Sequence, residues 1–258
     1  MTLEGRGAVV TGGGRGIGAA TARALAEEGA RVVVAARTSA EVADVADGIT
    51  ESGGAAWGIS CDVTDPASVD ALVDAAEERL GHVDVLVNNA GIAHSAPLAR
   101  TTLDDWRRVL DVNATGTFLV TRAFLPAMME RGWGRVVNVA SVAGLEADRY
   151  ISAYAAAKHA VIGFTRSVAA EAAPSGVTVN AVCPGYVDTD LTRASVARIV
   201  QKTGRTEEEA LAAILATTPE GRLLEPEEVA RAIVDLCGDA AADVNGQAIV
   251  LGWSEEKR

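Results

Sequence analysis

A chain of 258 residues with 49% hydrophobic and only 4% aromatic side chains fits one large α/β domain whose core is built from Ala, Val, Leu and Ile. Its formal net charge of −12 argues against nucleic acid as a partner, because phosphate binding requires clustered Lys and Arg. The apolar content also excludes an intrinsically disordered chain.

No apolar stretch reaches membrane-spanning length, and the first ten residues, MTLEGRGAVV, lack the order of a signal peptide. Three cysteines lie in apolar segments without CxxC spacing, as reduced thiols do: Cys61, Cys183 and Cys237. We therefore expect a cytoplasmic protein with no membrane partner. The three histidines are scattered along the chain, so we expect no metal site.

Short β-branched runs alternate along the chain with longer segments rich in Ala, Leu and Glu. These runs are apolar almost continuously, which is typical of strands covered on both faces of a parallel sheet. The pattern predicts an α/β fold: a Rossmann-type, doubly wound, seven-stranded parallel sheet with helices on both faces. The expected strands cover residues 7–12, 31–37, 55–63, 83–91, 134–141, 176–185 and 246–252.

Helix boundaries are marked by residues that favour helix ends. Asp65 and Pro66 precede a helical segment that Gly81 ends, and Pro226 lies near the start of the last helix. We find no repeat or linker, so residues 1–258 are expected to form a single NAD(P)-binding Rossmann domain. Residues 188–222 form a polar, helical insertion that we expect to cover the substrate.

The segment VVTGGGRGIGAATARALAEEG places Gly12, Gly16 and Gly18 between the first strand and the first helix. Glycines there allow a tight turn and a close approach of the backbone to a pyrophosphate, while the helix N-terminus supplies N–H donors. The alternative is a tight turn without a ligand. The position of the glycines after the first strand favours dinucleotide binding.

The end of the second strand lies near the adenosine ribose in this fold, where an acid favours NAD(H) and an arginine favours the 2′-phosphate of NADP(H). Arg37 occupies that place, no acid precedes Glu41, and Arg15 offers a second cation. We therefore predict NADP(H), with NAD(H) as the less favoured cofactor. The alternative is that Arg37 is a solvated surface residue.

Tyr154 and Lys158 interrupt a run of alanines in SAYAAAKHAV, and their i, i+4 spacing places them on one helix face. Together with the glycine loop, NNAG at 88–91, and Ser141, the YAAAK segment resembles the classical short-chain dehydrogenase/reductase family. The resemblance extends from about residue 7 to residue 252. The segments SAYAAAKHAVIGFT and VTVNAVCPGYV are similar to those of 3-oxoacyl carrier-protein reductases and polyketide ketoreductases.

The resemblance assigns roles to individual residues. The implied catalytic set is Asn113, Ser141, Tyr154 and Lys158. Asp62 and Val63 would lie against the adenine, Asn89, Ala90 and Gly91 on the adenosine side, and Pro184, Gly185, Val187 and Thr189 against the nicotinamide carboxamide. The remaining cofactor-binding residues would be Gly12, Arg15, Gly16, Ile17, Gly18 and Arg37, with Tyr154 and Lys158 also contacting the cofactor.

Hydride transfer to a ketone leaves negative charge on its oxygen, which the Tyr154 phenol can protonate. A lysine ammonium about 4 Å away contributes roughly 4 kcal/mol at an effective dielectric of about 20, so we expect Lys158 to lower the pKa of Tyr154. Ser141 would hydrogen-bond the substrate oxygen, and its alternative role is a helix or turn cap. By resemblance alone, Asn113 would anchor a water that relays protons to Lys158; alternatively it caps the backbone.

The expected function is an NADP(H)-dependent oxidoreductase that reduces a ketone, in a 3-oxoacyl thioester or a cyclic or aromatic compound, or catalyses the reverse reaction. Alternatives are an NAD-dependent secondary alcohol or hydroxyacyl dehydrogenase, and a non-catalytic NADP(H)-binding sensor. An acidic carrier protein would require basic residues beside the cleft, for which Arg131 and Arg135 are candidates unless they are solvated charges.

Relatives in the family usually form homotetramers through the helix before strand five and the helix that carries Tyr154, so we expect four chains. The C-terminus reads VLGWSEEKR, whereas many relatives have D-G-G after the last strand. This departure leaves Trp253 to contact either a neighbouring chain or the pocket.

Overall fold

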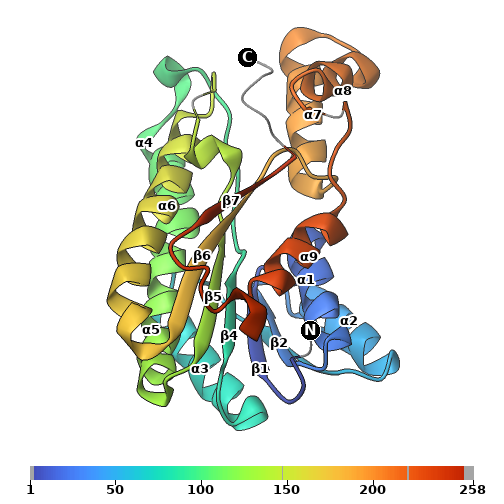
Figure 1. Ribbon diagram of the computed structural model, residues 1–258. Coiled ribbons are helices and arrows are strands. Elements are labelled where there is room, and N and C mark those ends of the chain that lie inside the picture. Colours follow the sequence, from blue (N-terminus) through green and yellow to red (C-terminus); the bar gives the residue numbers. More distant parts are fainter. Residues whose placement is uncertain (1–2, 147, 220, 253–258) are drawn as a thin grey trace.

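The computed structural model describes residues 3–146, 148–219 and 221–252, and all structural statements refer to these residues. Seven strands form one sheet in the order β3-β2-β1-β4-β5-β6-β7, and every neighbouring pair is parallel. The predicted fold class is therefore confirmed (Figure 1). The strands are β1 (Gly7–Thr11), β2 (Arg31–Ala36), β3 (Ala55–Ser60), β4 (Val85–Asn88), β5 (Gly134–Val139), β6 (Val177–Pro184) and β7 (Ala248–Leu251).

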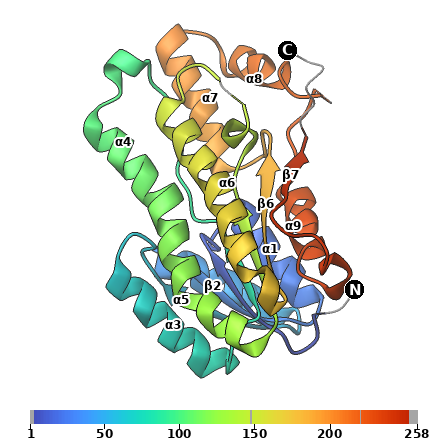
Figure 2. The same ribbon diagram turned by 60° about the vertical axis from the view of Figure 1, so that its left-hand side comes forward.

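Helices cover both faces of the sheet (Figure 1). One face carries α1 (Gly16–Glu27), α2 (Ser39–Glu51) and α9 (Pro226–Asp235), and the other carries α3 (Pro66–Leu80), α5 (Gly116–Arg131) and α6 (Ser152–Ala172). Away from the sheet lie α4 (Leu103–Leu110), α7 (Asp190–Thr203) and α8 (Glu207–Leu215). Figure 2 shows α7 and α8 beyond the end of the sheet, near the start of α6.

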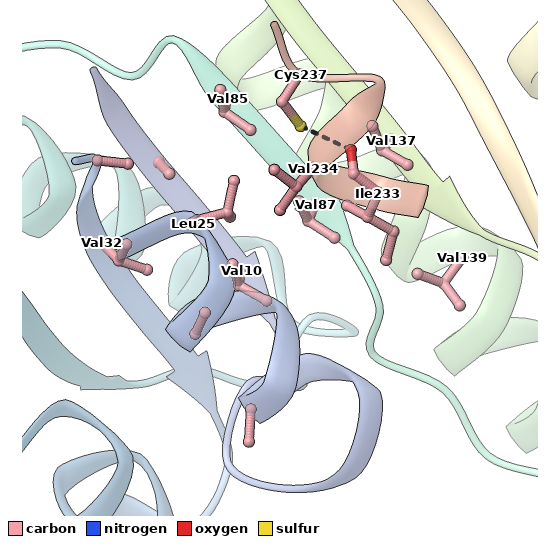
Figure 3. Packing of buried hydrophobic residues seen from close by; sticks show 14 of the residues in the cluster. Val10, Leu25, Val32, Val85, Val87, Val137, Val139, Ile233, Val234 and Cys237 are labelled. Carbon is pink, nitrogen blue, oxygen red and sulfur yellow. Dashed lines mark hydrogen bonds between the residues drawn. The ribbon is translucent and has the colours of Figure 1, made fainter. Parts of the chain in front are cut away.

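The uninterrupted apolar runs explain the two-sided core. In β1, Val10 packs toward α1 and α9, while its neighbour Val9 packs toward α3 and α5. Figure 3 shows the first of these layers, where Leu25 of α1 and Ile233 of α9 approach the valines of the sheet. Burial of each such side chain stabilises the fold by roughly 1.5–3 kcal/mol.

The predicted helix ends are present in the structure. The Asp65 carboxylate accepts a hydrogen bond from Ala67 N at 3.1 Å, Pro66 begins α3, and Gly81 ends it with a φ of 76°. Pro226 occupies the first position of α9. A proline fits there because the first N–H of a helix has no partner within the helix.

The strands end earlier than the sequence pattern predicts, most clearly in β4, which stops at Asn88. The apolar residues that follow, such as Ala90, belong to loops at the carboxyl ends of the strands. The strand order reverses direction at the neighbouring strands β1 and β4, which in this fold class opens a ligand-binding crevice at those ends.

The insertion at 188–222 forms two helices, α7 and α8, that pack on each other through Val196, Ala210 and Ile214. Tyr186 and Leu223 add to this small cluster from the adjoining loops. Among the described residues, no helix meets the length and hydropathy that crossing a membrane requires.

Candidate active site

One large cavity of about 1380 Å³ lies at the carboxyl ends of the strands. The loops after β1 to β6 all contribute to its lining. With one exception, the cavity is lined by every site residue that the sequence predicts: Gly12, Arg15, Gly16, Ile17, Arg37, Asp62, Val63, Asn89, Ala90, Gly91, Asn113, Ser141, Tyr154, Lys158, Pro184, Gly185, Val187 and Thr189.

The exception is Gly18, which packs beneath the loop and does not line the cavity. A Cβ atom at this position would lie 2.2 Å from the carbonyl oxygen of Gly12 and 2.5 Å from Asn89 Nδ2. The side chain of Asn89 in turn donates to the carbonyl oxygens of Thr11, at 3.1 Å, and Gly12, at 2.9 Å. Gly18 is thus a packing residue that allows this tight arrangement.

The glycine loop fits a pyrophosphate. Gly12 has a φ of 62°, and a Cβ there would lie 2.8 Å from Ala90 Cα, so a side chain would have no room. At the start of α1, Arg15 occupies the N-cap position without a capping side-chain hydrogen bond. The N–H groups of the first turn are therefore left to an anionic ligand, which the helix dipole also favours.

Arg37 and Asp62 line the cavity from the loops that follow β2 and β3. The Asp62 carboxylate accepts hydrogen bonds from the Thr64 backbone at 2.9 Å and the Thr64 hydroxyl at 2.7 Å. These bonds, together with the nearby Arg37 guanidinium, lower the pKa of Asp62. The two Thr64 hydrogen bonds thus fix the loop after β3 around a charged carboxylate.

Ser141 and Tyr154 come from separate elements and meet in the cavity. Ser141 follows β5 and caps the short 3₁₀ helix η3 (Val142–Gly144), where its Oγ accepts from Ala143 N at 3.2 Å. Tyr154 lies in the first turn of α6, and a side-chain hydrogen bond joins it to Ser141. The capping role of Ser141 is thus present, and its hydrogen bond to a substrate oxygen stays a prediction.

Lys158 lies one turn further along α6 and is only 5% exposed. Its Nζ donates to the carbonyl oxygen of Val139 at 2.8 Å and lies 5.7 Å from the centroid of the Tyr154 ring. The alanines between them are small, and Ala157 is fully buried against the neighbouring elements.

The expected effect of Lys158 on the Tyr154 phenol is wrong for this structure. Burial raises the pKa of Tyr154 to about 12, although the Ser141 hydrogen bond opposes the rise. Burial also lowers the pKa of Lys158 to about 8. Desolvation disfavours both charged forms, and the ammonium is directed at Val139 O rather than at the phenol.

Asn113 lies in a single π-helical turn, η2 (Asp111–Thr115), between α4 and α5. Such turns are frequent at functional sites. Its Nδ2 donates to the carbonyl oxygens of Val109, at 2.8 Å, and Ile92, at 2.9 Å. The backbone-capping role is thus present, and it fixes the loop after β4.

The other amide atom of Asn113 faces the cavity wall. Among the described residues, its buried Oδ1 has no hydrogen-bond partner. A Cβ on Gly91 would lie 2.8 Å from this oxygen and 3.6 Å from Lys158 Nζ. Gly91 therefore lets the Asn113 amide and the Lys158 ammonium approach the same point, and the water relay implied by the resemblance stays a prediction.

Glu41 also lines the cavity, and the sequence reasoning did not select it. It lies 4.0 Å from Arg15, measured from Oε1 to Nη1, and Arg15 pairs at 3.4 Å with Asp190 at the start of α7. No local spacing signals this contact, because Arg15 lies in the glycine loop, far from Glu41 along the chain.

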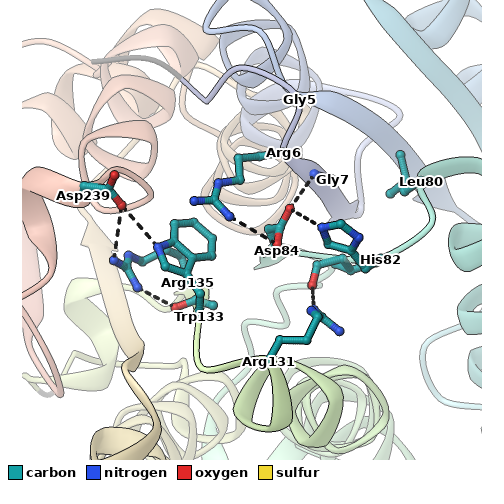
Figure 4. A network of polar contacts seen from close by, with 12 residues as sticks. Gly5, Arg6, Gly7, Leu80, His82, Asp84, Arg131, Trp133, Arg135 and Asp239 are labelled. Carbon is teal, nitrogen blue, oxygen red and sulfur yellow. Dashed lines mark hydrogen bonds and ion pairs between the residues drawn. The ribbon is translucent and has the colours of Figure 1, made fainter.

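The expectation that Arg131 and Arg135 flank the cleft is wrong. Both lie at the opposite edge of the sheet, in a polar network around Trp133 (Figure 4). Arg135 is 2% exposed and donates to the carbonyl oxygen of Gly176, while Arg131 donates to that of Val83. Both guanidinium groups hold neighbouring loops together. Trp253, which the sequence places against either a neighbouring chain or the pocket, lies outside the described residues.

The family model described as short chain dehydrogenase matches residues 6–199. The chain therefore belongs to the short-chain dehydrogenase family, and the resemblance seen in the sequence is confirmed. It is an oxidoreductase that interconverts carbonyl and hydroxyl groups with a nicotinamide dinucleotide.

Individual relatives are similar over almost their whole length. The chain is 40% identical over 249 residues to 3-oxoacyl-[acyl-carrier-protein] reductase FabG of Vibrio cholerae, with 96% of each chain covered. It is 44% identical over 246 residues to the monensin polyketide synthase putative ketoacyl reductase of Streptomyces virginiae, covering 95% of this chain and 94% of that protein. A crystal structure of an actinorhodin polyketide ketoreductase variant with NADPH superposes with a TM-score of 0.93 at 40% identity, with 97% of each chain covered.

Proposed function

We propose that this chain is an NADPH-dependent reductase of a ketone in a 3-oxoacyl or polyketide thioester. The observation that carries the proposal is the meeting of Ser141, Tyr154 and Lys158 in one cavity with the glycine loop. The relatives named as 3-oxoacyl carrier-protein and polyketide ketoacyl reductases support this substrate class.

NADP(H) is the proposed cofactor. The glycine loop and the start of α1 would hold its pyrophosphate, and Arg37 would face the 2′-phosphate. Within the described part of the chain, Arg37 has no carboxylate within 4.0 Å, so its charge remains available. NADPH in the actinorhodin ketoreductase structure supports the same choice. When bound, the reduced nicotinamide would supply the hydride.

Tyr154 would donate a proton to the substrate oxygen as negative charge develops there. A pKa of about 12 keeps the phenol protonated near neutral pH, and the protonated phenol is the form that reduction uses. The Ser141 hydroxyl would hydrogen-bond the same oxygen and orient it. Lys158, fixed by Val139 O, would hold the cofactor ribose beside Tyr154.

The insertion at 188–222 would shape the substrate side. Leu191, Ser195 and Arg198 of α7 line the cavity, and Leu191 is 42% exposed. The cavity exceeds the roughly 300–1,000 Å³ of a typical small-molecule site, which favours a long substrate bound together with a dinucleotide. A cyclic or aromatic ketone is the second candidate, favoured by the likeness to the actinorhodin ketoreductase.

We also propose a cytoplasmic homotetramer built from single-domain chains. All three cysteines are free and buried, which suits a reducing compartment. On the outer side of α5 and α6, Phe118 is 42% exposed and forms an edge-to-face pair with Phe164. Light scattering coupled to gel filtration would measure the number of chains.

The test of the proposed function is an assay of NADPH and NADH oxidation with acetoacetyl thioesters and with cyclic and aromatic ketones. We expect turnover of the acyl thioester with NADPH, and turnover at least about a hundredfold lower by Tyr154→Phe. Tight binding of NADPH without turnover of any ketone would instead indicate a cofactor sensor.

A further inference from the structure

Glu41 occupies a space that the glycine loop leaves open. It lies in the first turn of α2 and lines the cavity beside Arg15 and Arg37. A Cβ on Gly14 would lie 2.9 Å from Glu41 Cβ and 3.1 Å from Glu41 Oε2. The missing side chain at position 14 thus admits a carboxylate directly against the loop.

This carboxylate changes the charge at the adenosine end of the cavity. Arg15 lies 4.0 Å from Glu41 and 3.4 Å from Asp190, so two carboxylates already share its positive charge. Arg37 has no ion partner within 4.0 Å among the described residues and faces only the more distant charge of Asp62. Of the two cations expected to attract a 2′-phosphate, only Arg37 is free to do so.

We propose that Glu41 is a specificity-determining residue that weakens the binding of the 2′-phosphate and so reduces the preference for NADPH over NADH. The inference rests on the proposed function. A phosphate carries about −1.5 to −2 charges at pH 7 and is repelled by a neighbouring carboxylate. A ribose hydroxyl is not repelled by a carboxylate and can donate a hydrogen bond to it. Glu41 therefore acts against the contribution of Arg37.

The direct test is nucleotide binding to the full chain, measured by calorimetry at low ionic strength. Adenosine 2′,5′-bisphosphate and adenosine 5′-monophosphate differ only in the 2′-phosphate, so their comparison isolates its contribution. For Glu41→Gln we expect the bisphosphate to bind about three- to fivefold more tightly, in the range of an exposed charge pair. Binding of the monophosphate should stay within about 1.5-fold or weaken.

Glu51→Gln is the matched control, because Glu51 ends the same helix, is exposed and does not line the cavity. It removes the same charge and should leave both affinities unchanged. The effect of Glu41→Gln should shrink as salt is raised, because salt screens exposed charges. In the turnover assay, Glu41→Gln should raise the ratio of kcat/KM for NADPH to kcat/KM for NADH by about three- to fivefold.

An unchanged bisphosphate affinity, or an equal gain for both nucleotides, would overturn the role of Glu41 while leaving the proposed reductase intact. A gain of the same size in Glu51→Gln would also overturn it, since the effect would then come from net charge. Failure of the wild-type chain to bind either nucleotide would overturn both this inference and the proposed function.

Discussion

Lys158 Nζ lies 5.7 Å from the centroid of the Tyr154 ring and donates its hydrogen bond to the backbone of β5. The i, i+4 spacing brings the two residues onto one face of α6, but burial governs their ionisation. The phenol is kept neutral, and the ammonium is held against the carbonyl oxygen of Val139. The pair is therefore arranged for proton donation and positioning.

Removal of the phenol hydroxyl tests the proton donor. We expect Tyr154→Phe to fold normally and to lose at least about a hundredfold in kcat, because the substrate oxygen would have no proton donor. The rate of NADPH oxidation measures kcat, and the melting temperature shows whether the variant folds normally. Tyr150→Phe is the control, since Tyr150 is 58% exposed and does not line the cavity. Near-normal turnover by Tyr154→Phe would contradict the mechanism.

The buried ammonium should reduce the stability of the fold. In the folded chain the pKa of Lys158 is lowered from 10.5 to about 8, so the unfolded chain binds more protons between these values. Lys158→Met should therefore be more stable than the wild type at pH 7, by up to about 3 kcal/mol.

The lowered pKa of Lys158 also sets the pH range over which the stability difference between Lys158→Met and the wild type changes. From about pH 8 to 10.5 the folded chain has released the Lys158 proton while the unfolded chain still holds it, so wild-type stability rises with pH and the advantage of Lys158→Met shrinks. Urea unfolding of both proteins at pH 7, 8 and 9.5 measures the difference. A constant difference would mean that Lys158 is not destabilised by burial. Activity should be lost in the variant at every pH.

Asn113→Ala should destabilise the chain by about 2–3 kcal/mol, because two bonds to the carbonyl oxygens of Ile92 and Val109 are lost. Urea unfolding measures this loss. If Asn113 also serves the proton relay, kcat should fall at a temperature where the variant is fully folded. A folded variant with unchanged kcat would leave only the structural role.

Gly18→Ala should impair both folding and nucleotide binding, since the added Cβ would meet the carbonyl oxygen of Gly12 at 2.2 Å. Gly163→Ala is the matched control within α6, where an added Cβ meets no atom within 4 Å. That control should gain about 0.8–1 kcal/mol from the higher helix propensity of alanine. The melting temperature and the affinity for AMP are to be measured for both Gly18→Ala and Gly163→Ala. Equal behaviour would contradict the packing role of Gly18.

Arg37→Asp should reverse the cofactor preference, because the substitution replaces the available cation with a carboxylate that can accept a ribose hydroxyl. We expect the NADPH to NADH ratio of kcat/KM to fall by about tenfold or more, which is about 1.4 kcal/mol. Arg23, an exposed arginine of α1 outside the cavity, gives the control Arg23→Asp. An unchanged ratio in Arg37→Asp would reject the assignment of the 2′-phosphate site.

The sequence predicted the sheet because each strand is covered on both faces, and continuous runs such as the valines of β2 leave little ambiguity. It also predicted which loops meet, since the carboxyl ends of parallel strands share one edge. The pattern could not locate the strand ends, because apolar loop residues such as Ala90 and Ala140 continue the apolar runs.

Charged residues were harder to place. Arg135 is in a buried strand, and only the structure reveals that its guanidinium lies over Trp133 at 4.4 Å, far from the site. Glu41 was overlooked because its contact depends on Gly14 in the first loop, 27 positions earlier in the chain, and not on local spacing. The pKa of Tyr154 depends on desolvation, which needs the packed structure.

The network around Trp133 stabilises the edge of the sheet that takes no part in the chemistry. Arg6 also lies over the Trp133 ring, at 3.7 Å, and faces the buried Asp84, which accepts from Gly7 N at 3.0 Å (Figure 4). These contacts tie the starts of β1, β4 and β5 together. The scaffold is therefore fastened at the ends of the strands that lie away from the cavity, so a change in the loops that line the cavity leaves these contacts intact.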